Sequence, residues 1–214
     1  MGIHIEQFTF NGFQENTYVI HDGKVCVIVD PGCSDRREEE VLLRFIDGNG
    51  LEPKAVLLTH AHIDHVLGCA FLTAHYNIGY VLHEADVPTL EAVPNYAHVY
   101  GFPHYTSPGK PHQLLKGGET LQYGDMNFEV LFTPGHAPGH VVFYLPSEGL
   151  VINGDVLFAG SFGRVDLPGG DLETLKHSIF DVMFHLPEET VVYCGHGPET
   201  TIAREKRSNY ILHY

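Results

Sequence analysis

The chain has 214 residues, of which 43% are hydrophobic, and a formal net charge of −15 at pH 7. This length suits a single domain with a sizeable core, which we expect to span residues 1–214. The acidic charge disfavours nucleic acid as a partner, and no apolar run reaches the roughly 18 residues of a membrane helix. The first residues alternate like a strand and lack the features of a signal peptide.

Four cysteines stand at positions 26, 33, 69 and 194. They form neither a CxxC pair nor a dense disulfide framework, which predicts a reduced protein of the cytoplasm. We expect neither nucleic acid nor a membrane as a partner, and the sequence leaves the oligomeric state open.

The first half of the sequence contains short apolar segments that are typical of strands. The run KVCVIVD ends in Asp-Pro-Gly, which indicates a buried strand followed by a turn. Ser34 or Asp35 can cap a helix that Gly48 and Gly50 close. We expect strands over residues 3–10, 17–21, 24–30, 54–59 and 79–83, and helices over 35–48 and 66–76.

Residues 88–113 are rich in Pro, Gly, Tyr and His and show no clear period. We interpret them mainly as an irregular excursion with one helical turn. Such a long segment in a compact domain is usually functional or disordered, and its aromatic residues argue against disorder. The sequence leaves its role open.

From residue 119 onward the pattern is typical of strands joined by tight turns. Gly124-Asp125 and Ser147-Glu148-Gly149 mark two hairpins, and Asp171 is the expected cap of a helix. We expect strands over 119–123, 126–132, 140–145, 150–154 and 190–194, and helices over 171–185 and from about residue 200. Both halves therefore predict an α+β fold of two mixed sheets packed face to face, with helices outside.

The segment HAHIDH at residues 60–65 directly follows an expected buried strand. It places four side chains that can bind metal, His60, His62, Asp64 and His65, within six positions. We expect this segment to be a loop, on which the four can surround one point. Neutral imidazoles and carboxylates suit zinc, iron and manganese.

Three further candidate ligands each follow an expected strand. They are His136 in TPGH, Asp155 in NGD and His196 in CGHG. A glycine beside each lets the backbone turn sharply. Any one of these patterns is usually an ordinary turn or loop. Chance poorly explains the occurrence of all of them at strand ends in one chain.

Seven ligands are too many for one tetrahedral zinc and suit two metals that share a carboxylate. Our hypothesis assigns His60, His62 and His136 to one metal, and Asp64, His65 and His196 to the other. Asp155 then bridges the two ions. We expect two divalent cations, with zinc first and iron or manganese as alternatives.

The order HxHxDH, His, Asp, His resembles the metallo-β-lactamase superfamily. The quoted motifs span residues 60–197, and VDPG at 29–32 is similar to the superfamily's first motif. The resemblance implies an αββα four-layer sandwich. It also implies that Asp30 supports the metal-binding segment from behind the ligands.

Within the superfamily, three segments resemble the glyoxalase II group: TPGHAPGHVVFY, GDVLFAGSFGRVDLPGGD and GHGPETTIAREK. The last two are most similar to the short bacterial form, which lacks the helical C-terminal domain. Two residues depart from the pattern. Cys194 stands where the group usually has Pro, and Asp166 stands where members that bind glutathione tend to have an aromatic residue.

This resemblance implies a binuclear hydrolase that cleaves a thioester such as S-lactoylglutathione through a metal-bridging hydroxide. Asp64 would be catalytic as well as a ligand, because it can orient the hydroxide. A thiolate is a good leaving group, so a thioester needs no dedicated general acid. Arg164 falls where glyoxalase II has a cation near the glutathione glycine carboxylate, and the alternative is an ordinary surface arginine.

Two other activities of the same superfamily stay open. One is a persulfide dioxygenase with a single iron, and the other is a lactonase. A nonenzymatic zinc module fits poorly, because structural zinc sites are usually rich in thiolates. The sequence does not identify the metal, the acyl group or the thiol carrier, nor whether the host makes glutathione.

Overall fold

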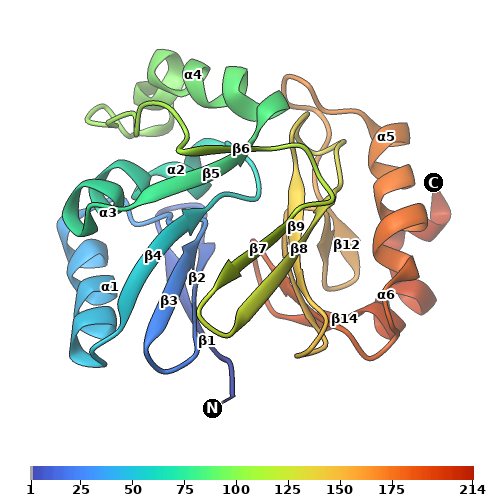
Figure 1. The fold of residues 1–214 in the computed structure, drawn as a ribbon. Helices are drawn as coiled ribbons and strands as arrows, with labels where there is room; N and C mark the ends of the chain where they lie inside the picture. Colours follow the sequence, from blue (N-terminus) through green and yellow to red (C-terminus); the bar gives the residue numbers. More distant parts are fainter. Residues whose placement is uncertain (1) are drawn as a thin grey trace. The chain divides into compact units, whose positions relative to one another are not determined.

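The computed structural model describes residues 2–214, which form two compact units (Figure 1). The first unit comprises the chain up to Leu115 together with Gln122–Met126. The second unit comprises Lys116–Leu121 and Asn127–Tyr214. Each unit has its own cluster of buried hydrophobic side chains.

The first unit contains a six-stranded sheet in the order β1-β2-β3-β4-β5-β6. Strands β1, β2 and β3 pair antiparallel, whereas β3 to β6 pair parallel, so the sheet is mixed. Strands β3 and β5 and the second half of β4 are buried and largely apolar, as expected for parallel strands that are covered by helices, whereas β6 is mostly exposed. The strands are β1 His4–Phe10, β2 Glu15–His21, β3 Val25–Val29, β4 Glu52–Leu57, β5 Gly79–His83 and β6 Gln113–Leu115.

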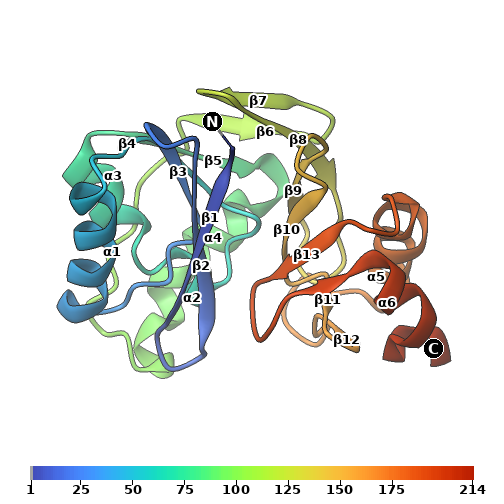
Figure 2. The ribbon, with the colours of Figure 1, turned by 90° about the horizontal axis from the view of Figure 1, so that it is seen from below.

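Helices α1 and α3 lie on the same side of this sheet (Figures 1 and 2). Asp35 caps α1 by accepting hydrogen bonds from the backbone amides of Arg37 and Glu38, as the sequence predicts. Leu42 and Ile46, four residues apart, are the buried residues of this helix. The helices of the first unit are α1 Arg36–Gly48, α2 Ile63–Val66, α3 Cys69–Tyr76 and α4 Val87–Tyr96, with 3-10 turns η1 Glu84–Asp86 and η2 Ala97–Tyr100.

The expectation of a mainly irregular excursion over 88–113 is wrong for its first part. Residues 87–100 form α4 and η2. Pro88 stands in the first turn of α4, where a missing backbone N–H costs nothing. Leu90, Val93 and Ala97 recur on one helical face and are buried. The high content of Pro, Tyr and His hides this periodicity in the sequence.

The other six-stranded sheet is mixed and has the order β14-β13-β10-β9-β8-β7; it belongs to the second unit apart from Gln122 and Tyr123 of β7 and Met126 of β8. Strands β8, β9 and β10 pair antiparallel, and β10 pairs with β13 parallel. A short hairpin, β11 Leu157–Phe158 with β12 Ser161–Phe162, forms a separate sheet. The six strands are β7 Thr120–Tyr123, β8 Met126–Phe132, β9 Val141–Leu145, β10 Leu150–Gly154, β13 Val191–Cys194 and β14 Thr200–Thr201.

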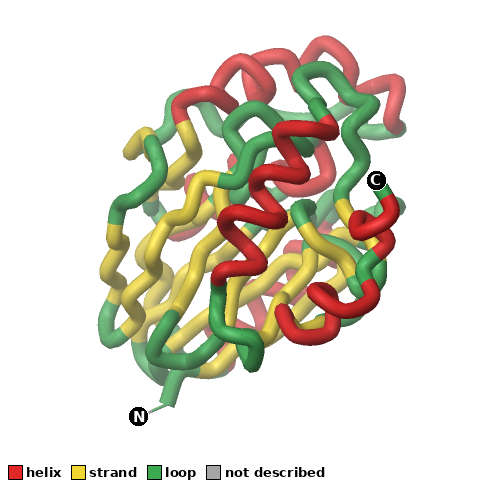
Figure 3. The backbone as a smooth tube through the Cα atoms, turned by 90° about the vertical axis from the view of Figure 1, so that its right-hand side faces the viewer, coloured by secondary structure: helices red, strands yellow, loops and turns green. Residues whose placement is uncertain are grey.

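One helical run lies in front of the strands of the second unit in Figure 3. It comprises α5 Leu172–His177, a π-helical turn η3 Ser178–Val182 and a 3-10 turn η4 Met183–His185, and Asp171 caps it as predicted. Leu175, Ile179 and Met183 are buried in the core cluster that this run shares with β9, β10 and β13. Two more helical segments follow, α6 Ile202–Ser208 and η5 Tyr210–His213.

The predicted α+β class with two mixed sheets is confirmed. Among residues 2–214, no helix combines the length and the apolar character that crossing a membrane requires.

We predict that Leu42→Ala lowers the free energy of unfolding by about 2–5 kcal/mol, because it leaves a cavity beneath α1. Leu42 is fully buried, whereas its neighbour Val41 is 38% exposed. Val41→Ala is therefore the matched control, with an expected change within about 0.5 kcal/mol. Urea denaturation of both variants measures the difference. Equal losses would contradict the assignment of the buried face.

Candidate metal centre

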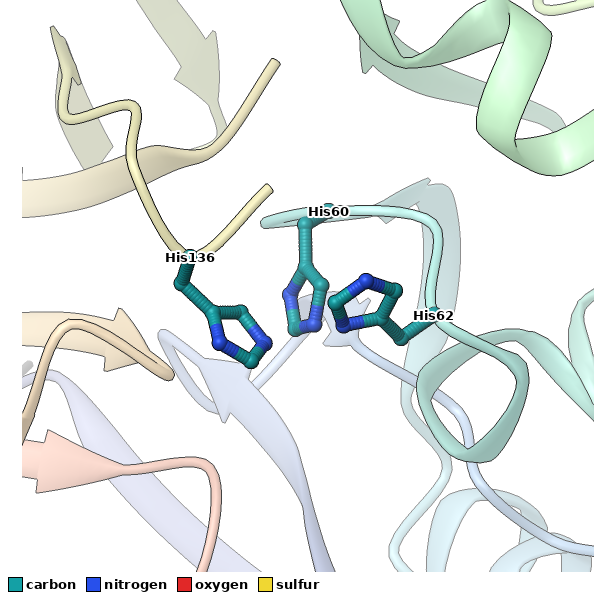
Figure 4. A group of neighbouring side chains, drawn as sticks. All are labelled: His60, His62 and His136. Atoms are coloured by element: carbon teal, nitrogen blue, oxygen red, sulfur yellow. The ribbon is translucent and has the colours of Figure 1, made fainter. Parts of the chain in front are cut away.

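In the first unit, the HAHIDH segment begins three residues after β4. His60, His62 and His65 are buried, and the ring centroid of His60 lies 4.7 Å from that of His62 and 4.2 Å from that of His65. Figure 4 shows the rings of His60 and His62 on this segment. The expectation of a loop holds for these two residues only. Asp64 and His65 lie in α2, because the chain turns helical directly after His62.

Asp30 lies behind these histidines, one residue after β3, in a left-handed backbone conformation with φ 47°. Its Oδ1 accepts a hydrogen bond from the backbone amide of Thr59 at 2.7 Å. Its Oδ2 accepts from the Thr59 hydroxyl at 2.5 Å and from Nδ1 of His65 at 3.1 Å. Donor atoms of Asp30, His60 and His65 all lie within 4.8 Å of one another. The carboxylate therefore fixes both the segment and one of its imidazoles.

These bonds also define which ring nitrogen of His60 and of His65 could bind a metal. The Thr59 hydroxyl donates its proton to Asp30, so it accepts the hydrogen bond from Nδ1 of His60 at 3.0 Å. Nδ1 of His65 donates to Asp30. We therefore assign the proton to Nδ1 in both rings, which leaves the Nε2 lone pair for a cation.

Two further side chains that the sequence analysis did not single out hold the same segment. Asp86 is fully buried in η1, and its carboxylate accepts a hydrogen bond from the backbone amide of Ala61 at 2.6 Å. Asn11 donates from Nδ2 to the backbone carbonyls of Asp64 at 3.1 Å and Gly32 at 3.0 Å. Both act from more than 20 residues away, so no local pattern marks them.

Glu15 is a third side chain that sequence reasoning missed. It is fully buried at the start of β2 and accepts the Thr17 hydroxyl at 2.9 Å. Burial raises the pKa of its carboxyl well above the ordinary value. Gly32 makes room for it, because a Cβ there would lie 2.0 Å from Glu15 Oε2 and 2.6 Å from the Asp64 carbonyl oxygen. The glycine of the VDPG motif is thus required by close approach.

In the second unit, the three predicted ligands lie after β8, β10 and β13. Nε2 of His136 and Nε2 of His196 each lie 3.5 Å from Oδ2 of Asp155. Nδ1 of His136, whose ring Figure 4 shows, donates to the backbone carbonyl of Arg164 at 2.7 Å. Its Nε2 therefore carries the lone pair, as in His60 and His65.

A fully buried histidine, His140, also escaped the sequence analysis. Its Nε2 accepts a hydrogen bond from the backbone amide of Asp155 at 3.1 Å, and its Nδ1 lies 3.1 Å from the Thr133 hydroxyl oxygen. The available signal was its position in the motif APGH, four residues after His136 and directly before the apolar run of β9. Asn153 supports the same turn through bonds to the backbone carbonyls of Gly154 and Leu157.

Arg164, the expected substrate contact, has a side chain that is 61% exposed. Its guanidinium holds Asp166 with two hydrogen bonds, Nε–Oδ1 at 2.6 Å and Nη2–Oδ2 at 2.7 Å. This pairing lowers the pKa of Asp166 to about 2. The role of Arg164 in binding substrate stays a prediction.

The donor atoms suit a divalent cation of intermediate hardness. The candidates are neutral imidazoles and carboxylates, which bind zinc, iron and manganese. No cysteine belongs to the groups of described residues whose donor atoms converge, and burial raises the pKa of the Cys194 thiol to about 12. Within the described residues, each unit thus presents imidazole and carboxylate donors and no sulfur ligand.

Residues 10–196 match the metallo-β-lactamase superfamily. The chain belongs to this superfamily of metallohydrolases, as the motifs predicted. It is 40% identical to the "probable metallo-hydrolase YqgX" of Bacillus subtilis over 200 residues, covering 93% of this chain and 92% of the relative. It is 37% identical to the "hydroxyacylglutathione hydrolase GloC" of Haemophilus influenzae over 212 residues, covering 98% of each.

Solved structures show the same fold. The BLEG-1 B3 metallo-β-lactamase superposes with a TM-score of 0.88 at 37% identity, covering 98% of this chain and 99% of that one. The protein TTHA1623, solved in a di-iron-bound form, gives 0.85 at 41% identity, covering 96% and 98%. ETHE1 from Myxococcus xanthus gives 0.79 at 26% identity, covering 97% and 83%.

We predict that Asp30→Asn weakens metal binding by about 10- to 100-fold, because it removes the charge that orients His65 and Thr59. Competition with a chromogenic chelator measures the dissociation constant of Zn²⁺. Asp35→Asn is the control, because asparagine also caps a helix and Asp35 is exposed. Unchanged zinc affinity in Asp30→Asn would refute the supporting role of Asp30.

Proposed function

We propose that this chain is a binuclear metallohydrolase that cleaves a thioester, with hydroxyacylglutathione as the first candidate substrate. The similarity to the GloC hydrolase over 98% of both chains carries this proposal. The match to the superfamily supports it further, because that match spans all seven candidate ligands.

We further propose that the candidate ligands of the two units form one site in the folded chain. His60, His62 and His136 would hold one cation. Asp64, His65 and His196 would hold the other, and Asp155 would contact both. The Nδ1 hydrogen bonds of His60, His65 and His136 support this assignment, because they hold the proton on Nδ1 and so place the lone pair, which can bind a cation, on Nε2.

When bound, two divalent cations would lower the pKa of a water molecule and polarise the substrate carbonyl. The carboxylate of Asp64 would accept a hydrogen bond from that water and orient it toward the acyl carbon. The thiol of the leaving group has an ordinary pKa near 8–9, so it can depart as the thiolate without a proton donor from the protein. This chemistry favours thioesters over amides as substrates.

Zinc is our first expectation for the metal, and iron is the main alternative, since the relative TTHA1623 was solved with two irons. The four cysteines are buried and form no disulfide within residues 2–214, which fits a reducing cytoplasmic environment.

The test combines metal analysis with hydrolysis of S-lactoylglutathione by the purified protein. We expect two metal ions per chain and thioester cleavage, and loss of at least one ion and about 10²-fold or more of kcat/KM in Asp155→Ala. One iron per chain with persulfide-dependent oxygen uptake would instead identify a dioxygenase. Cleavage of lactones without thioester cleavage would identify a lactonase.

A β-lactam is the second substrate class to assay, because the chain is 37% identical to the BLEG-1 B3 metallo-β-lactamase over nearly its whole length. An amine leaves less readily than a thiolate, so we expect a lower kcat for the β-lactam than for the thioester. The reverse order of kcat/KM would replace the thioester proposal with β-lactam hydrolysis.

We predict that Arg164→Ala raises KM for S-lactoylglutathione more than it lowers kcat, if the guanidinium binds the carboxylate of the carrier. Arg36→Ala, at an exposed arginine in α1, is the control and should leave both constants unchanged. An unchanged KM in Arg164→Ala would remove this residue from the proposed substrate site.

A further inference from the structure

The turn that carries Asp155 is held by several long-range contacts within the second unit. The pairing of β10 with β13 shifts register between Ile152 and Gly154, which bends the chain just before Asp155. The carbonyl of Gly154 then accepts the backbone amide of Gly195 at 2.7 Å. On the other side, Gly163 approaches so closely that a Cβ there would lie 1.9 Å from the Asp155 carbonyl oxygen.

His140 adds a side-chain contact to the backbone of Asp155 itself. The Asp155 amide can only donate, so Nε2 of His140 must accept, and the ring proton lies on Nδ1. Nδ1–H donates to the Thr133 hydroxyl, and the backbone amide of Thr133 donates to the carbonyl of His140 at 2.9 Å. The imidazole is therefore neutral, fixed at both nitrogens and fully buried.

The geometry of this contact separates His140 from the metal ligands. Its two ring nitrogens are both engaged by protein groups, so neither offers a lone pair to a cation. Its ring centroid lies 6.0 Å from that of His136, the ligand four residues earlier in the chain. His140 instead fixes the amide of the residue whose carboxylate lies 3.5 Å from both His136 Nε2 and His196 Nε2.

We propose that His140 is a positioning residue for the metal centre. It holds the backbone of Asp155, so that the carboxylate is placed between the two histidines of the second unit before any cation binds. This inference rests on the proposed function, because it takes Asp155 as a ligand. Positioning of this kind improves metal affinity by reducing the reorganisation that binding requires.

Two substitutions at this position differ in one hydrogen bond. Glutamine can place Oε1 near the position of Nε2 and accept the Asp155 amide. Asparagine is one methylene shorter, so its amide reaches Thr133 but leaves the Asp155 amide unsatisfied. His140→Asn should therefore lose the positioning contact, and His140→Gln should retain it.

The experiment measures the Zn²⁺ dissociation constant of the metal-stripped protein by chelator competition, and thermal unfolding of the same samples. We expect His140→Asn to bind Zn²⁺ about 10- to 100-fold more weakly, and His140→Gln to recover most of this loss. Ile202→Ala, a cavity variant in the core of the second unit, is the control for general destabilisation. It should lower the melting temperature and keep the zinc affinity.

Wild-type zinc affinity in His140→Asn would overturn the proposal, and so would an equal loss of affinity in His140→Asn and Ile202→Ala. Asp155→Ala is measured alongside as the reference. If Asp155→Ala binds Zn²⁺ as tightly as the wild type, the proposed ligand set fails. If it loses zinc while His140→Asn does not, only the positioning role fails.

Discussion

The hydrogen bonds to Nδ1 are the interactions on which the candidate centre depends. An imidazole binds a cation only through a nitrogen that carries a lone pair, so the proton must be held on the other nitrogen. Asp30 accepts the hydrogen bond from Nδ1–H of His65, and the Thr59 hydroxyl accepts the one from Nδ1–H of His60. In the second unit, the carbonyl of Arg164 does the same for His136. A carboxylate, a hydroxyl and a backbone carbonyl thus each hold the proton of one histidine on Nδ1.

The strands give these groups their positions. β3 and β4 are parallel neighbours, so Asp30 and Thr59 leave the sheet at the same edge and meet there. β10 and β13 are also parallel neighbours, and Asp155 and His196 follow their ends. Ligands from distant parts of the sequence are therefore brought together by main-chain pairing, and side-chain hydrogen bonds then fix their orientation.

Much of this arrangement was predictable from sequence because it depends on local signals. Apolar runs that end in glycine marked β3, β10 and β13, and Asp35 and Asp171 marked the helix starts. Helix α4 was missed because its apolar spacing is hidden among prolines and tyrosines. The strands of two or three residues, β6, β11, β12 and β14, are too short for any periodicity.

The supporting residues could not be predicted for a different reason. Asp86 and His140 accept hydrogen bonds from backbone amides 25 and 15 residues away, and Glu15 lies beside His65, which is 50 residues further along the chain. In sequence, a buried glutamate within a strand looks the same as an exposed one. Only the folded chain shows that each of these side chains meets a group that needs a partner.

Gly32 illustrates how such packing restricts the evolution of the chain. A methyl group at this position would overlap Glu15 Oε2, the Asp64 carbonyl oxygen and Asn11 Nδ2 at the same time. Two of these atoms end side chains, but the Asp64 carbonyl belongs to the backbone, so the metal-binding segment itself would have to move to accept the methyl group. A chain that keeps this hydrogen-bond arrangement is therefore confined to glycine at this position.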